Sequence, residues 1–229
     1  MALIQAVAND NGAGATTLVA TIASSTVGSC LTAIVGRLAN LVTGVTDNLA
    51  QTYTAAFTPG AFTEAAGAWI CPNSAAGVTT ITATFSASTG SVIFALEESG
   101  IVTASPVDQT QRSTSTSGAT YDSGATATTT NANDVGYAIA CSAATSNVNF
   151  AADAGWTAVT GTGITSGHHG NTTEGDDLFV ARREYTATGA YSATGTLTSN
   201  THAGTIVILM QAAVGPAPRI TFPTTSVAF

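Results

Sequence analysis

Apolar residues recur at every second position in several short segments of this chain. In TTITATFS (79–86), Ile81, Ala83 and Phe85 alternate with polar residues, most of them threonine. A period of two is that of a β-strand, whereas an amphipathic helix repeats every 3.6 residues. Threonine is β-branched and suits the exposed face of a pleated sheet. Similar patterns predict further strands over 17–22, 91–99, 134–142, 178–187 and 190–197, and the segment 203–213 is apolar on both faces, as a central strand would be.

Turn-forming residues separate these segments. Clusters of Asn, Asp, Gly and Ser predict turns over 9–14, 46–51, 86–91 and 198–204. No segment has the pattern of a capped amphipathic helix, and glycine is spread throughout. Many short strands with turns between them are typical of sandwiches and jelly rolls. We therefore predict an all-β fold, an antiparallel β-sandwich or jelly roll, formed by a domain of residues 1–213.

Two segments depart from this regular pattern. The segment 105–134 is a long connection rich in Ser, Thr, Gly and Ala, with an edge strand predicted near 124–130. A connection of this length is usually functional or crosses between sheets. The segment VGPAPRITFPTTSVAF (214–229) contains three prolines, which favour an extended chain over a helix.

We interpret 214–229 as an extended C-terminal arm, because an apolar segment without a core of its own is costly to leave in water. Docking on a neighbouring subunit is the favoured interpretation. A disordered tail is the alternative, since termini are often disordered unless they are tied down. The residues expected to make the contact are Arg219, Phe222, Val227 and Phe229.

Charge is scarce and mostly negative. Only 8% of residues are charged, the formal net charge is −8, and the chain has no lysine. Nucleic acids and anionic membranes are bound by clustered basic residues, so neither is an expected partner. No apolar run approaches the roughly 20 residues of a membrane helix. The start, MALIQAVANDNG, lacks the basic and apolar regions of an export signal.

A neutral surface of Thr and Ser without an export signal fits a virion component made in the host cytoplasm. An ordinary β-protein, or a secreted protein whose signal has been removed, would have the same composition. The three cysteines, Cys30, Cys71 and Cys141, form no zinc-binding spacing and allow at most one internal disulfide. We expect them to be buried free thiols.

The densest cluster of titratable residues is GHHGNTTEGDD (167–177). His168 and His169 could bind a metal together with Asp176 or Asp177, or one could act as a general base. The segment has no HExxH spacing, no EF-hand pattern and no G-x-S-x-G elbow. Neighbouring side chains of a strand also face opposite ways. We therefore expect a polar loop, with no metal or cofactor.

The same alternation applies to two adjacent pairs of charged residues. Glu97 and Glu98 cannot flank one glycosidic bond from a strand, so we do not expect an enzyme. Of Arg182 and Arg183, one should point inward and need a carboxylate, for which Asp176 or Asp177 is nearest in sequence, although two solvated arginines on an edge strand are equally compatible.

Several segments in series carry a resemblance. They are TGVTDNLAQTYTAAF (43–57), AWICPNSAAGVTTITATFS (68–86), SVIFALEESGI (91–101), ADAGWTAVT (152–160) and the final EYTATGAYSATGTLTSNTHAGTIVILMQA. Together they resemble a β-sandwich domain that recurs in bacteriophage structural proteins and in bacterial surface or secreted proteins. Here DNLAQTY lacks the glycine of the usual turn, and LEESG lacks the usual aromatic residue.

The resemblance covers most of 2–213 and implies a structural or surface-binding module with no active-site residues. With the composition, it leads us to expect a phage capsid decoration (cement) protein. Such a protein would contact the major capsid protein or other virion proteins and form a homo-oligomer, most simply a trimer. The alternative is a glycan- or receptor-binding module of a tail fibre or adhesin, in which Trp69 or Trp156 would stack on a sugar.

Overall fold

The structure, a computed structural model, describes residues 1–36, 41–57, 66–113, 116–143, 149–171 and 176–210. Its described elements are antiparallel β-strands, and none of the described residues forms an α-helix. The strands are β1 (Ala2–Asp10), β2 (Ala15–Thr21), β3 (Cys30–Gly36), β4 (Val42–Asp47), β5 (Thr54–Ala55), β6 (Gly67–Cys71), β7 (Thr80–Thr89), β8 (Val92–Ser99), β9 (Val107–Arg112), β10 (Thr116–Asp122), β11 (Asp134–Ala143), β12 (Phe150–Ala152), β13 (Thr157–Ala158), β14 (His168–Asn171), β15 (Asp176–Tyr185) and β16 (Thr194–Met210).

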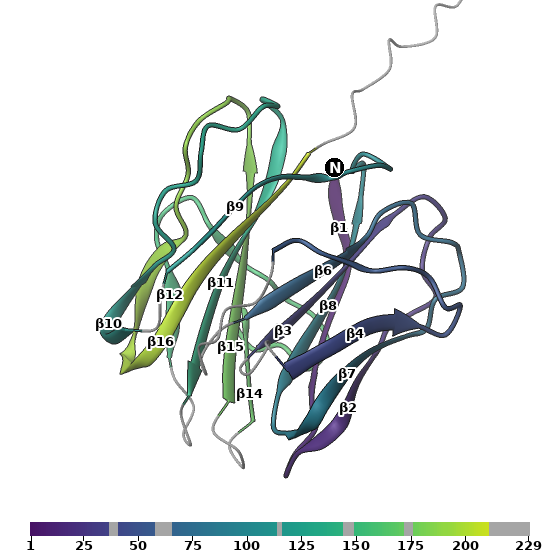
Figure 1. Cartoon of the computed structure of the whole chain (residues 1–229). Coiled ribbons are helices and arrows are strands. Elements are labelled where there is room, and N and C mark those ends of the chain that lie inside the picture. Colours follow the sequence, from purple (N-terminus) through teal and green to yellow (C-terminus); the bar gives the residue numbers. More distant parts are fainter. Residues whose placement is uncertain (37–40, 58–65, 114–115, 144–148, 172–175, 211–229) are drawn as a thin grey trace, which may run out of the picture.

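These strands form three sheets that stack on one another (Figure 1). The middle sheet has the order β1-β8-β3-β6-β5. A three-stranded sheet, β2-β7-β4, packs on one face of it, and a larger sheet packs on the other. The larger sheet has the order β10-β16-β11-β15-β13, with β9 and β12 on β16 and β14 on β15. The predicted all-β antiparallel sandwich is confirmed, and the structure adds a third layer.

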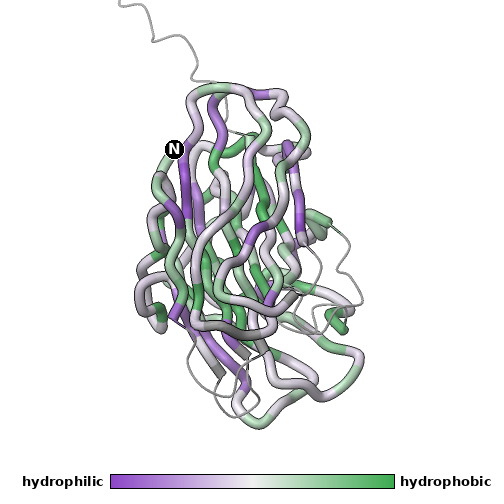
Figure 2. The backbone as a smooth tube through the Cα atoms, turned by 90° about the vertical axis from the view of Figure 1, so that its left-hand side faces the viewer, coloured by the Kyte–Doolittle hydropathy of each residue, from purple (hydrophilic) through white to green (hydrophobic). Residues whose placement is uncertain are grey.

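The middle sheet is buried on both faces, so alternate residues of its strands enter two different cores. On β8, Phe94 and Leu96 face the large sheet, while Ile93 and Ala95 face the three-stranded sheet. Strand β3 is buried along its whole length. Figure 2 shows the resulting concentration of hydrophobic segments in the interior. Burial on both faces explains why these strands are almost continuously apolar.

The predicted alternation is confirmed in β7 and in β11. Ile81, Ala83 and Phe85 of β7 all enter the core beneath the three-stranded sheet. The alternate apolar residues of β11, including Val135 and Ile139, enter the core between the middle and large sheets. The intervening residues of β11 enter a third core on the outer face of the large sheet, together with Tyr121 of β10.

The predicted turn over 198–204 is wrong, because those residues lie inside β16. This strand is long enough to pair with β10 and β12 through its first half and with β9 and β11 through its second half. His202, within the supposed turn, is buried and its Nε2 lies 2.7 Å from the carbonyl oxygen of Thr120. Pairing with four other strands therefore keeps residues 198–204 extended, although their composition favours a turn.

The connection 105–134 contains two strands that sequence alone does not reveal, β9 and β10. The prediction of an edge strand near 124–130 is wrong, because these residues form no strand. That segment nevertheless hydrogen-bonds to 189–193 through the amides of Thr126 and Thr129, at 2.9 Å each. These bonds, with those that Gln109 and Gln111 of β9 donate to residues 128 and 125, attach the segment to the large sheet.

The three cysteines are buried free thiols, as expected. Cys30 and Cys71 enter cores on opposite faces of the middle sheet. Burial raises the pKa of Cys30 to about 12 and that of Cys71 to about 11. Among the described residues, none forms a helix with the length and apolar character needed to cross a bilayer. The arm 214–229, with Arg219, Phe222, Val227 and Phe229, lies outside the described residues.

Candidate functional site

The histidine-rich segment is a strand rather than a polar loop. Strand β14 begins at His168 and pairs with β15, placing His168 opposite Phe179 and His169 opposite Leu178. Residues 168–171, expected to belong to a polar loop, are therefore one strand of a pair, and residues 172–175 of that segment lie outside the described residues. A two-residue turn with positive φ at Ser166 (50°) and Gly167 (81°) leads into β14. This turn type is compatible with the twist of paired strands.

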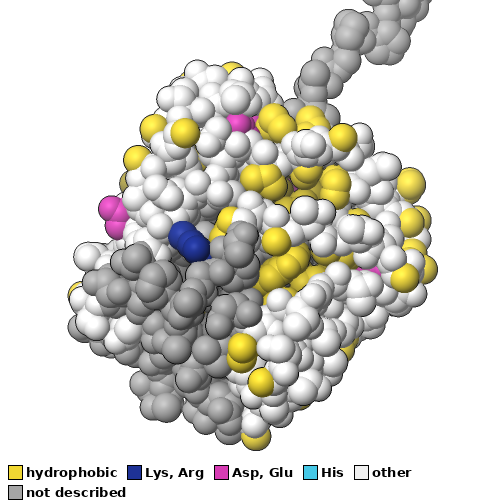
Figure 3. Space-filling view, in the orientation of Figure 1, with side chains coloured by type: hydrophobic (Ala, Val, Ile, Leu, Met, Phe, Trp, Pro, Cys, Tyr) yellow, Lys and Arg dark blue, Asp and Glu magenta, His cyan; other side chains and the backbone are white. Residues whose placement is uncertain are grey.

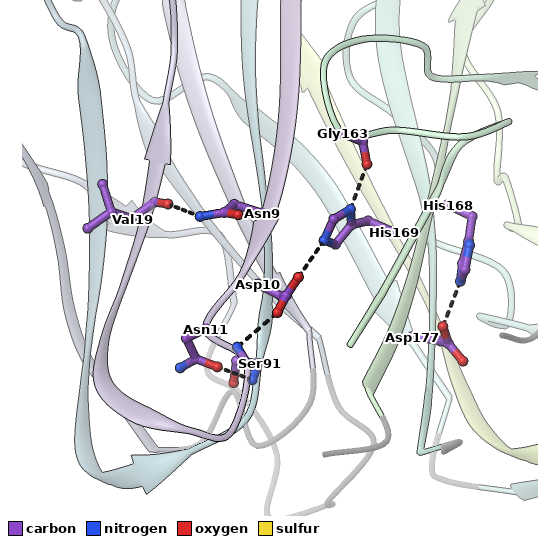
Figure 4. Close-up of polar contacts among 10 residues, drawn as sticks. Asn9, Asp10, Asn11, Val19, Ser91, Gly163, His168, His169 and Asp177 are labelled. Atoms are coloured by element: carbon purple, nitrogen blue, oxygen red, sulfur yellow. Dashed lines mark hydrogen bonds and ion pairs between the residues drawn. The ribbon is translucent and has the colours of Figure 1, made fainter. Parts of the chain in front are cut away.

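The two histidines use different carboxylates (Figure 4). His168 Nε2 lies 2.7 Å from Oδ1 of the buried Asp177. His169 Nε2 lies 3.0 Å from Oδ2 of Asp10, while its Nδ1 lies 2.6 Å from the carbonyl oxygen of Gly163. Asp10 belongs to β1, so His169 links the large sheet to the middle sheet.

An open hollow of about 380 Å³ lies beside these histidines. Phe150, Thr165 and Ser166 also line it. The ring of Phe150 lies 5.8 Å from that of His168 and stacks on Phe179 at 5.6 Å. Within the described part of the chain, no three His, Cys, Asp or Glu side chains gather as a metal site would require. The geometry is that of two His–Asp pairs that join neighbouring strands.

The adjacent glutamates face opposite ways, as the alternation predicts. Glu97 accepts hydrogen bonds from Nε2 of Gln5 at 2.5 Å and from the amide of Thr26 at 2.6 Å. Glu98 accepts one from the Tyr137 hydroxyl at 2.8 Å. Both glutamates are buried, with at most 1% of either residue exposed. Their hydrogen bonds compensate the cost of placing carboxylates inside the protein.

Arg182 is the inward-pointing arginine, and the buried carboxylate that it meets is Glu98 rather than the predicted Asp177. The side chain of Asp176, the other predicted partner, lies outside the described part of the structure. Arg182 Nε and Nη2 donate to the two oxygens of Glu98, at 3.2 and 2.5 Å. Its Nη2 also donates to Glu184 at 2.9 Å. Burial lowers the pKa of Arg182, but the hydrogen bonds and charge of Glu98 outweigh it, so the pKa lies above its ordinary value. This ion pair connects β15 of the large sheet with β8 of the middle sheet.

Burial of Tyr137 raises its pKa well above the ordinary value, and the neighbouring Glu98 adds to the effect. The hydroxyl therefore stays protonated and donates to the carboxylate. Tyr137, Glu98 and Arg182 form one polar group between two sheets. Its arrangement is that of a structural contact, in which each charge is matched and hydrogen-bonded.

The tryptophans are packing residues in the structure. Trp69 is buried in the core beneath the three-stranded sheet. Trp156 is half-buried and packs against the outer core, where its ring meets that of Tyr185 edge-on at 6.3 Å. The guanidinium of Arg183, the outward arginine, lies over the Tyr185 ring, 5.2 Å from its centroid.

A different surface feature was not anticipated from sequence. Between β5–β6 of the middle sheet and β9 of the large sheet lies a hollow of about 310 Å³, here called the β5–β9 opening. Figure 3 shows apolar side chains gathered on this face. Ile70, only 2% exposed, belongs to its lining. The residues that line the opening are Thr54, Ala55, Ala56, Ile70, Pro72, Ser105, Pro106 and Val107.

Two details place the β5–β9 opening in the molecule. Half-buried Phe57 follows Ala56, and the guanidinium of Arg112 lies 5.7 Å from its ring centroid. The last described residue, Met210, donates its amide to the carbonyl of Pro106 at 2.8 Å. The segment that leads to the arm therefore starts beside this opening. No sequence signal could find it, because its lining comes from three separate segments.

Of the expected contact residues, Arg219, Phe222, Val227 and Phe229 have no described position. Comparison with family models, with curated proteins and with solved structures finds no match to this chain.

Proposed function

We propose that this chain is a structural virion protein, a capsid decoration (cement) protein that stabilises a shell through subunit contacts. The observation that carries the proposal is the apolar β5–β9 opening on a surface otherwise rich in Thr and Ser. Exposed apolar groups that gather on one face are a feature of interaction sites. Its proposed partners are the major capsid protein and further copies of this chain.

The use of charge inside the protein supports the same proposal. Glu97, Glu98, Arg182 and Asp177 are engaged in contacts that connect strands or sheets. Carboxylates that accept hydrogen bonds between strands and sheets stabilise one arrangement of the layers. A three-layer sandwich whose sheets are joined by hydrogen bonds and ion pairs suits a protein that reinforces a shell. The proposed location is the virion, after synthesis in the host cytoplasm.

A second candidate function, glycan or receptor binding, rests on one observation. A hollow of about 400 Å³ lies between Leu3 of β1 and Arg182 and Arg183 of β15. Gly155 and Thr157, which flank the half-buried Trp156, also line it. An aromatic ring beside polar groups is a common arrangement for sugar binding. The decoration role is favoured because the Trp156 ring already packs against Tyr185.

The experiment is quantitative mass spectrometry of particles banded in a density gradient from the producing culture. A decoration protein is expected at a fixed copy number relative to the major shell protein, unchanged by a high-salt wash. Light scattering of the purified protein is expected to give a trimer. Absence from banded particles would contradict the proposal. Binding of the purified protein to a glycan array, lost in Trp156→Ala, would support the second candidate instead.

A further inference from the structure

We infer that the β5–β9 opening is the acceptor for residues 219–229 of a second copy of this chain. The inference rests on the proposed structural function and names the surface that would join the subunits. The proposed occupant is a segment of this protein rather than a different partner.

The position of Met210 is the first argument. Its amide bonds to Pro106, and Pro106 lines the opening. The chain that leads to residues 219–229 therefore leaves the described fold beside the opening of its own subunit. Residues 211–229 span up to about 60 Å when extended, at roughly 3.3 Å per residue. This length is enough to reach an adjacent subunit of the same size.

The chemistry of the two surfaces matches. Residues 219–229 contain four large apolar side chains, Ile220, Phe222, Val227 and Phe229. The opening offers apolar contacts from Ala55, Ala56, Pro72 and Val107 above the buried Ile70. Its volume of about 310 Å³ can accept an aromatic side chain. Burying such a side chain contributes to association through the hydrophobic effect.

The spacer favours exchange between copies over docking within one chain. Gly215-Pro216-Ala217-Pro218 separates the end of β16 from the first apolar residue of the segment. Proline-rich segments are extended and semi-rigid, and advance by about 3.1 Å per residue. Because Met210 bonds to Pro106 at the opening, docking within one chain would require the chain to turn back on itself between residues 210 and 219, a stretch that contains this spacer. A neighbour's opening can be reached without a reversal, and a ring of such contacts fills every opening.

Photo-crosslinking can test both the acceptor and the exchange. Phe222 is replaced by p-benzoylphenylalanine, and unlabelled and nitrogen-15-labelled chains are mixed in equal amounts, unfolded and refolded. The expected crosslinks join residue 222 to peptides containing 54–56 or 105–107, and about half of them carry mixed isotopes. The same photoreactive residue at Val27, which is 73% exposed, is the control and should not label these peptides. Crosslinks without mixed isotopes, or to other surfaces, would overturn the inference.

A second measurement avoids dependence on crosslinking geometry. Ala55→Glu puts a charge into the exposed wall of the opening, and Val19→Glu adds the same charge on the three-stranded sheet. We expect Ala55→Glu and Phe222→Ser each to weaken self-association at least tenfold in sedimentation equilibrium. Val19→Glu should leave it unchanged, and circular dichroism checks that all three fold. Unchanged self-association in both Ala55→Glu and Phe222→Ser would refute the inference.

The two proposals can fail separately. If the protein is present in particles at fixed copy number but residue 222 does not crosslink to the opening, the virion role stands and the acceptor is wrong. If mixed-isotope crosslinks form in a protein absent from particles, the exchange stands and the virion role is wrong.

Discussion

Arg182 donates two hydrogen bonds to the carboxylate of Glu98 across the boundary between two sheets, although the residues are 84 positions apart in sequence. Both side chains are largely withdrawn from water, with 16% of the Arg182 side chain and 1% of the Glu98 side chain exposed. Removing one member of such a pair leaves an uncompensated buried charge. Replacing both with apolar side chains removes the charge altogether.

We therefore predict that Arg182→Met lowers the free energy of unfolding by about 3–5 kcal/mol. The double variant Arg182→Met/Glu98→Leu should recover a large part of that loss. Urea denaturation of the two single variants and the double variant measures the coupling. Arg183→Met is the matched control and should cost under about 1 kcal/mol, because its guanidinium lies over the ring of Tyr185 rather than beside a buried carboxylate. Equal losses at 182 and 183 would show that the ion pair does not hold the sheets.

His169 provides a second link between the sheets, to Asp10 of β1. His169→Leu removes this contact and the one to Gly163, and is expected to lower stability by about 1–2 kcal/mol. The loss of protection from hydrogen exchange should be larger near His169 than in the rest of the protein. The amides of Ala8 and Thr162, which bond between β1 and the segment before β14, should exchange hydrogen faster. Amides of β7 serve as the internal reference, and faster exchange there as well would mean general loosening instead.

Asp108 gives the protein a predictable response to acid. Burial raises the pKa of its carboxyl, but hydrogen bonds from Asn131, Thr130 and Gln109 outweigh this and lower it below 3.8. A lowered folded-state pKa means that the carboxylate contributes stability above the unfolded-state pKa. That contribution disappears as the pH falls through the folded-state pKa.

Asp108→Asn should accordingly be less stable than the parent at pH 7, and the difference should shrink as the pH falls below about 4. Thermal unfolding between pH 2 and pH 7 measures both curves. The control is Asp122→Asn, an exposed residue that accepts one hydrogen bond, from the amide of Gly124 at 2.8 Å. A constant difference across this pH range would show that the Asp108 charge has no part in stability.

The cysteines should be unreactive in the folded protein. Burial raises the pKa of Cys30 to about 12 and of Cys71 to about 11, so almost no thiolate forms at pH 8. Iodoacetamide is expected to modify no cysteine under native conditions and all three after denaturation in urea. Intact-protein mass spectrometry counts the added groups. Rapid native modification of Cys71 would mean that the three-stranded sheet opens readily.

Sequence predicted the fold class because the two-residue period is a local property. Ile81, Ala83 and Phe85 identify one face of β7 without any knowledge of its neighbours. Strand β9 escaped prediction because VDQTQR is mostly polar. Its Gln109 and Gln111 side chains donate hydrogen bonds to the carbonyl groups of Thr128 and Ala125. A polar strand whose side chains hydrogen-bond to another polar segment has no apolar face to reveal it.

At the candidate sites, the sequence likewise predicted the direction of side chains but not their partners. Alternation showed that Glu97 and Glu98 face opposite ways, and that Arg182 and Arg183 do so too. It could not show that Glu98 and Arg182 meet, because their strands belong to different sheets. Choosing Asp177 by sequence proximity failed, since His168 on the paired strand occupies that carboxylate. The β5–β9 opening depends wholly on distant segments.

The division of strands between sheets also has a consequence for synthesis on the ribosome. Strands β1 to β8 complete the middle and three-stranded sheets, whereas β9 to β16 make up the large sheet. A nascent chain that has emerged as far as Ser99 can close the core beneath the three-stranded sheet. It then displays the other face of the middle sheet, with Ile34, Phe94 and Leu96, until the large sheet arrives. The interval between the two halves is when this chain is most exposed to aggregation, and when a chaperone has most to protect.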